Sequence, residues 1–106
     1  MTDQLTALEA LEAAVEAGGF RIEPSIVAFG GQQTNNASRS FHGDMSAAIA
    51  LAESVVPEWG WFIDSTGRAE LFNPNNIRTV KSHNVFPTRA LLLTVIRAKI
   101  VEVKEW

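Results

Sequence analysis

The stretch PEWGWFID, residues 57–64, decides the fold, because a helix-forming segment ends there and a strand begins. Pro57 stops the preceding helix, since proline lacks an amide hydrogen and its ring clashes with the turn before it. In an extended strand alternate residues share a face, so Trp59, Trp61 and Ile63 fall on the same side. We expect helices to cover that side, because small domains usually bury tryptophan. Stacking of a ligand on one of the tryptophans is the alternative.

The residues after this stretch predict an antiparallel hairpin. STG (65–67) is typical of a turn, and RAELF (68–72) has the composition of a returning strand, so the hairpin runs from about 58 to 72. NPNNIRTVKSHN (73–84) follows as an amide-rich connection, in which residues 77–80 could add a short third strand.

Three segments have strong helix signals. Residues 3–17 place leucine and valine at helical spacing opposite a stripe of glutamates, and Thr2 or Asp3 can cap the start. Residues 44–56 are alanine-rich, begin with a capping residue and end before proline. Residues 87–103 begin with proline and are apolar around more than half of their circumference, which predicts a central helix covered on most sides.

Two further segments are less decisive. FRIEPSIVAFGG (20–31) could be a strand by composition, but Pro24 and the glycines at its end favour a short helix over 24–29. GGQQTNNASRSFHG (30–43) is rich in amides and hydroxyls, and we expect a polar loop that is excluded from the core. Together these patterns predict one α+β domain over residues 1–106, in which a small antiparallel sheet packs with helices.

Composition excludes several classes of function. At 106 residues and 46% hydrophobic the chain suits one globular domain. The absence of cysteine excludes disulfides, thiolate metal sites and a thiol nucleophile. The acidic start lacks the basic region of a secretory signal, and no apolar run approaches the roughly 20 residues of a membrane span. We therefore expect a cytoplasmic protein without a membrane partner.

The net charge of −3 conceals an asymmetry between the two ends of the chain. Residues 1–23 are acidic, whereas residues 77–106 hold six of the nine basic side chains. We expect the acidic helix to face solvent or to lie beside the basic C-terminal one. The alternative is an anion-binding patch in the C-terminal third. So few basic residues do not predict general nucleic-acid binding.

No standard catalytic or cofactor motif is present, so we assign no catalytic residues, no cofactor and no metal. His42, Asp44 and His83 have side chains that suit zinc or manganese, but two histidines about 40 residues apart are more typical of surface loops. A small hydrolase using His42 or His83 remains an alternative.

The two polar segments hold the candidate binding residues. Side-chain amides can form hydrogen bonds with the edges of bases or peptides, and Arg or Lys binds phosphates and carboxylates. If the two segments meet at one end of the sheet, they would rim a site for a nucleotide-like ligand or an acidic partner surface; otherwise they are ordinary turn-forming residues. The candidates are Gln32, Gln33, Asn35, Asn36, Arg39, His42, Asn75, Asn76, Arg78, Lys81 and His83.

The order of segments resembles a known family. MSAAIALAESVVPEWGWFI (45–63), a hairpin and then FPTRALLLTVIRAKI (86–100) are similar to the pattern of the phage ABA sandwich domain, and LTALEALEAAVEAGG (5–19) and PSIVAFGG (24–31) resemble its leading helices. The resemblance implies a compact α/β/α-type sandwich and a phage or prophage origin, but transfers no catalytic residue. The loop GGQQTNNASRS, residues 30–40, departs from the pattern.

From the resemblance and the missing catalytic motifs we expect a non-enzymatic phage accessory protein, able to form a homo-oligomer, that inhibits a host protein, such as a defence factor, by direct binding. A sponge that sequesters a signalling nucleotide is the first alternative. A virion assembly factor is a further one.

Overall fold

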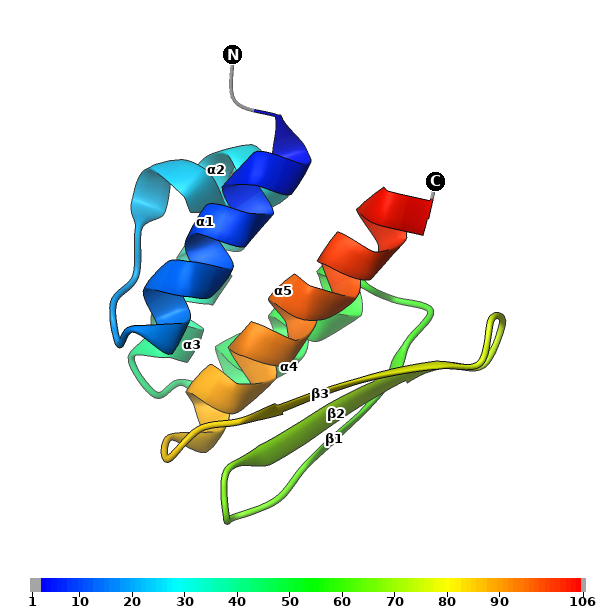
Figure 1. Cartoon of the computed structure of the whole chain (residues 1–106). Coiled ribbons are helices and arrows are strands. Elements are labelled where there is room, and N and C mark those ends of the chain that lie inside the picture. Colours follow the sequence, from blue (N-terminus) through cyan, green and yellow to red (C-terminus); the bar gives the residue numbers. More distant parts are fainter. Residues whose placement is uncertain (1–2, 106) are drawn as a thin grey trace.

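The computed structural model describes residues 3–105, which form five helices and one three-stranded sheet (Figure 1). In chain order the elements are α1 (Gln4–Glu16), α2 (Ile22–Phe29), α3 (Gly31–Phe41), α4 (Met45–Val55), β1 (Gly60–Ile63), β2 (Arg68–Asn73), β3 (Arg78–His83) and α5 (Pro87–Glu105). The α+β class is confirmed, as are the helices expected at 3–17, 44–56 and 87–103 and the hairpin at 58–72. Thr2, the alternative first cap, lies outside the described residues.

Two aspartates start helices as the sequence predicts. The Asp3 carboxylate accepts a hydrogen bond from the Thr6 amide at 2.7 Å, and the Asp44 carboxylate accepts one from the Ala47 amide at 3.0 Å. These backbone hydrogen bonds are the main reason that the pKa of each carboxyl is lowered. Both helices therefore begin where a side chain replaces the missing backbone acceptor.

Helix α5 is the centre of the molecule. Ten of its 19 residues are buried, and it packs against α1, α3 and α4 on one side and against all three strands on the other. Figure 1 shows it lying between the sheet and the remaining helices. The layers thus run sheet, α5, other helices. The arrangement differs from an α/β/α order in that the helices lie on one side of the sheet.

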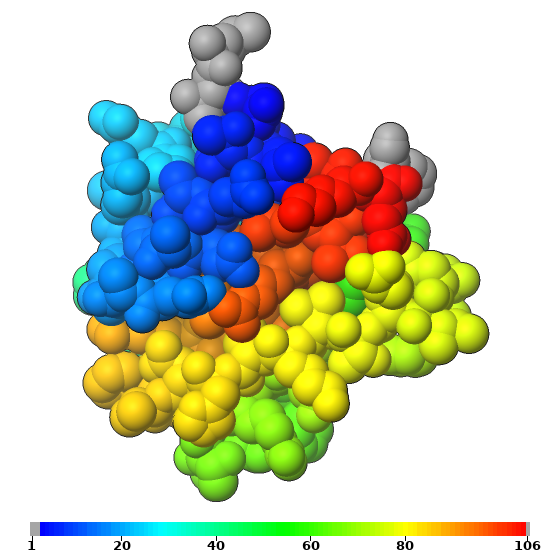
Figure 2. Space-filling view, viewed as in Figure 1, coloured from blue at the N-terminus to red at the C-terminus, as the bar shows by residue number. Residues whose placement is uncertain are grey.

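The acidic and basic helices lie side by side, as expected from their charges (Figure 2). Arg97 of α5 donates to Glu12 at 2.8 Å and also to Glu16 of α1, and it reaches Ser82 Oγ of β3 at 3.0 Å. Burial lowers the pKa of Arg97, but the hydrogen bonds and charges of the two glutamates outweigh it and leave the pKa raised. One guanidinium therefore ties α1, α5 and β3 together.

The sheet has the order β1-β2-β3 with antiparallel pairing throughout. Residues 78–83 form a full third strand, longer than the one expected over 77–80. Trp59 is buried as predicted, with 5% of its surface exposed, whereas Trp61 remains 39% exposed. Gly67 in the β1–β2 turn has φ of +90°, and a Cβ there would come within 1.7 Å of the Asn84 carbonyl oxygen. Only glycine fits that turn without a shift.

The prediction of a loop over residues 30–43 was wrong, because residues 31–41 form α3 and one side of it enters the core. Its buried residues are Thr34, Ala37, Ser40 and Phe41, three of them small. The Thr34 hydroxyl lies 3.0 Å from that of Ser25, and Ser40 Oγ donates to the Thr88 carbonyl at 3.0 Å. A polar helix can be buried on one side when every hydroxyl finds a partner.

Candidate functional site

The outer side of the sheet, turned away from α5, is the most distinctive surface of the described chain. Residues of β2 alternate, with Ala69, Leu71 and Asn73 buried towards α5 and the residues between them turned outward. The strand register places partners from β1 and β3 beside those outward residues. We call this surface the open face; it consists of Phe62, Arg68, Glu70, Phe72, Thr79, Lys81 and His83.

Two phenylalanines dominate the open face. Phe62 of β1 is 48% exposed and Phe72 of β2 is 44% exposed, although both belong to regular strands. The register sets Phe72 opposite Gly60, so no side chain lies directly opposite its ring on β1. The Arg68 guanidinium lies 5.9 Å from the centre of the Phe62 ring, within the range of a cation–π contact. Half-exposed aromatic rings on a rigid sheet are common anchors of interfaces.

The open face carries charges of both signs. Glu70 pairs in register with Lys81 of β3, and Arg68 forms an ion pair with Asp64 at 3.2 Å. The pKa of Asp64 is lowered, first by the hydrogen bond that its carboxylate accepts from the Thr66 hydroxyl and then by the Arg68 amide. With opposite charges alternating around two aromatic rings, the face suits a protein surface better than a polyanion.

Exposed apolar residues continue beyond the end of β3. Val85 is 78% exposed and Phe86 is 53% exposed. The Asn84 amide donates to the Gly67 carbonyl at 2.9 Å, which holds this segment beside the β1–β2 turn. Arg89 lies 4.5 Å from the centre of the Phe86 ring, so this corner is packed. The apolar surface therefore extends around one end of the sheet.

The predicted site residues of the first polar segment lie on the helical side of the molecule, on α3 or at its end. Asn36 donates to Gln33 at 3.2 Å, and Arg39 pairs with Asp44 at 2.6 Å. His42 ends the helix, with its Nδ1 at 2.8 Å from the Ser38 carbonyl oxygen. The remaining members of the segment on α3 are Gln32 and Asn35.

The second polar segment is divided between three places. Asn75 and Asn76 lie in the β2–β3 turn, and Arg78 pairs with Glu105 at the end of α5. Lys81 and His83 belong to the open face. Figure 1 places α3 and the β2–β3 turn on opposite sides of the molecule. The chain itself does not bring the two segments into one rim.

The basic residues named for an anion site are likewise separate. Arg39 and Arg78 are each engaged by a carboxylate in a different region, and Lys81 faces outward from β3. Among residues 3–105, no three histidine, aspartate or glutamate side chains gather closely enough to hold a metal ion.

Sequence reasoning did not single out Phe62 and Phe72 as exposed residues of the sheet. The alternation of β1 places Phe62 on the side opposite the tryptophans, and RAELF puts Phe72 on the same side as Arg68 and Glu70. An apolar residue among outward polar positions was the available signal. Its meaning depends on which layers cover the sheet, which the sequence pattern does not reveal.

Comparison with known proteins gives no relative: no protein family, curated protein or solved structure matches this chain. In the part of the chain that the structure describes, no helix combines the length and the apolar character needed to cross a lipid bilayer.

Proposed function

We propose that this chain is an accessory binding protein that acts by docking its open face on another protein, without converting a substrate. A phage or prophage source, and a host factor as the target, belong to the proposal through the resemblance described above. Inhibition would follow from covering a functional surface of the target.

The observation that carries the proposal is the pair of half-exposed phenylalanines on a sheet face that no helix of residues 3–105 covers. Burying a fully exposed phenylalanine stabilises a complex by about 1.5–3 kcal/mol, and each of these half-exposed rings has roughly half of that still to gain. The sheet holds both rings rigidly, so little conformational entropy is lost on binding. Glu70, Arg68 and Lys81 around the rings would select a partner with complementary charges.

Capture of partners by the purified, tagged chain tests the proposal. The double variant Phe62→Ser/Phe72→Ser removes both rings from the open face. The matched control is Ile26→Ser/Val27→Ser on α2, because Ile26 and Val27 are 47% and 46% exposed and lie elsewhere. We expect the control to retain a stoichiometric partner from host lysate and the open-face variant to lose it. Equal capture by both variants would refute the open face as the docking surface.

Sequestration of a nucleotide is the weaker proposal, because Arg39, Arg78 and Lys81 do not share a site within one chain. It would require a second copy to complete the pocket. A thermal-shift screen with linear and cyclic nucleotides tests it, and the absence of any shift would rule it out.

A further inference from the structure

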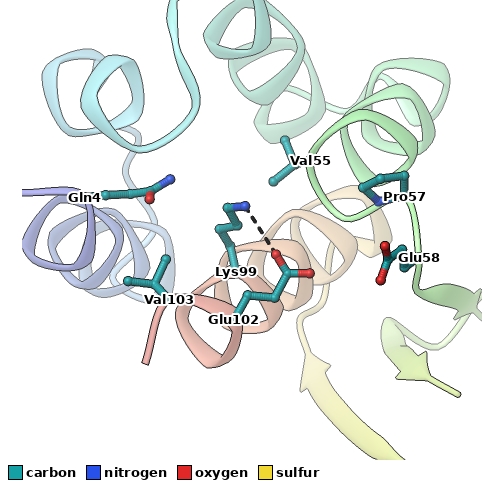
Figure 3. A pocket seen from close by; sticks show the side chains of 7 residues that line it. All are labelled: Gln4, Val55, Pro57, Glu58, Lys99, Glu102 and Val103. Atoms are coloured by element: carbon teal, nitrogen blue, oxygen red, sulfur yellow. Dashed lines mark hydrogen bonds and ion pairs between the residues drawn. The ribbon is translucent and has the colours of Figure 1, made fainter. Parts of the chain in front are cut away.

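A pocket of about 490 Å³ opens where four segments meet on the helical side of the sheet (Figure 3). The start of α1, the end of α4, the 57–58 segment and the C-terminal half of α5 surround it. Its volume falls in the range of roughly 300–1,000 Å³ that is typical of small-molecule sites. We call it the Lys99 pocket; its lining residues are Gln4, Val55, Pro57, Glu58, Lys99, Glu102 and Val103.

A charged pair is held in place at the base of this pocket. Lys99 Nζ donates to Glu102 Oε1 at 3.2 Å, and the other carboxylate oxygen of Glu102 accepts from Trp59 Nε1 at 2.8 Å. The side chains of Lys99 and Glu102 are only 25% and 22% exposed. Because the buried Trp59 orients Glu102, the ammonium group is positioned before any ligand arrives.

The lining residues retain unused hydrogen-bonding capacity. Within residues 3–105 the Lys99 ammonium makes one hydrogen bond of the three it can donate. Gln4 donates its amide to the Ala28 carbonyl at 2.9 Å, and its side-chain oxygen accepts no hydrogen bond from the described part of the chain. Glu58 accepts from Asn75 at 3.2 Å on one oxygen, and its other oxygen has no described partner. Figure 3 shows the ammonium directed towards the space between Gln4 and Val55.

Charge and shape then select the class of ligand. One lysine against two glutamates gives the lining a net charge of −1, which disfavours a phosphate dianion. A single carboxylate can bind the free N–H groups of Lys99, and an ammonium can bind the free oxygen of Glu58. Val55, Pro57 and Val103 form an apolar wall for a short aliphatic body.

We propose that the Lys99 pocket binds a small aliphatic amino acid, or a zwitterion of the same chemistry, with its carboxylate at Lys99 and its ammonium at Glu58. This site is separate from the open face and does not depend on the function proposed for that surface.

Three probes with the same kind of branched aliphatic body test the proposal. Leucine carries both charged groups, 4-methylpentanoate carries only the carboxylate, and 3-methylbutylamine carries only the ammonium. In NMR titrations of the isotope-labelled protein at neutral pH, we expect leucine to shift the Trp59 indole and Val103 amide signals saturably, with a dissociation constant of about 1 mM. Each single-charge probe should bind about tenfold more weakly, because it leaves one charged group unpaired.

Variants of the pocket separate a specific site from weak surface binding. Lys99→Met and Glu58→Gln should each weaken leucine binding by about tenfold. Lys104→Met, an exposed lysine on the same helix outside the lining, is the control and should leave it unchanged. If Lys99→Met fails to fold, Glu58→Gln decides, since Glu58 is exposed.

Three results would overturn the proposal: no saturable shift up to the solubility limit of leucine, equal binding of all three probes, or an equal loss in the Lys104 control. Phe62→Ser/Phe72→Ser should still bind leucine, so failure of the docking function and failure of this site remain distinguishable.

Discussion

The two faces of the same strand, β2, have opposite surroundings. Towards α5 it presents Ala69 and Leu71, both fully buried, whereas outward it presents Phe72 with nearly half of its surface exposed. Both faces carry apolar side chains, but among residues 3–105 only the inner one has a covering layer. The apolar side chains on the inner side of the sheet therefore stabilise the fold, whereas those on the outer side remain accessible to a binding partner.

The largest expected effect lies on the inner face. Leu71→Ala should lower the free energy of unfolding by about 2–5 kcal/mol, because it removes buried methyl groups and leaves a cavity against α5. Phe72→Ser, one residue along, should change it by less than about 1 kcal/mol, since its ring is already half in water. Chemical denaturation measures both. Similar losses for the two variants would remove the distinction between the faces.

A second effect concerns the turn that links the strands of the hairpin. Gly67→Ala should destabilise the protein by about 1–3 kcal/mol, because φ of +90° strains alanine and its Cβ meets the Asn84 carbonyl oxygen. Gly18→Ala after α1, where a Cβ meets no atom within 4 Å, is the control for positive φ alone. In thermal unfolding, Gly67→Ala should have a lower melting temperature than Gly18→Ala. The reverse order would contradict the close approach of the Asn84 carbonyl oxygen to position 67.

The ion pairs between α1 and α5 provide a third test, away from both faces. Arg97→Met should lower the free energy of unfolding by about 1–3 kcal/mol. It leaves the carboxylates of Glu12 and Glu16 without their shared cation and removes the hydrogen bond to Ser82 Oγ. Part of that loss should disappear at high salt, because screening weakens the repulsion between the two glutamates. An effect near zero at low salt would show that the network does not stabilise the packing of α1 on α5.

The smallest effect is a dependence on pH at the helix caps. The folded state lowers the pKa of Asp44 below 3.8, so its capping contribution is present above that value and is lost as the pH falls through the folded pKa. Replacing Asp44 with Ala should therefore lower thermal stability at neutral pH, and the difference from the unaltered protein should shrink in acid. If the difference in thermal stability between the two proteins stays constant from neutral to acid pH, the Asp44 carboxylate is not the group that stabilises the start of α4.

The helices with caps and stop signals were predictable from local chemistry. The carboxylates of Asp3 and Asp44 accept hydrogen bonds from amides three residues along the chain, and Pro57 and Pro87 act through their own rings. Helix α3 was not predictable in that way. Its small hydroxyl residues read as a loop until their partners on α2 and α5 are known. Whether the two polar segments meet was not predictable from local chemistry either, because it depends on how distant elements pack.

The second polar segment illustrates this limit. Its residues alternate between the two sides of β3, so Arg78 meets α5 while Lys81 joins the open face. The composition of the segment does not show that Arg78 and Lys81 lie on different sides of the sheet. The strand register does, because it fixes the side of the sheet to which each residue points.

The most direct test of docking through the open face is photo-crosslinking in cells that produce the natural partner. A benzoyl-phenylalanine placed at position 72 probes the open face, and one placed at position 26 probes an equally exposed site on α2. If the open face is the docking surface, we expect a discrete crosslinked partner from position 72 and none from position 26. A partner captured from position 26, with none from position 72, would contradict it.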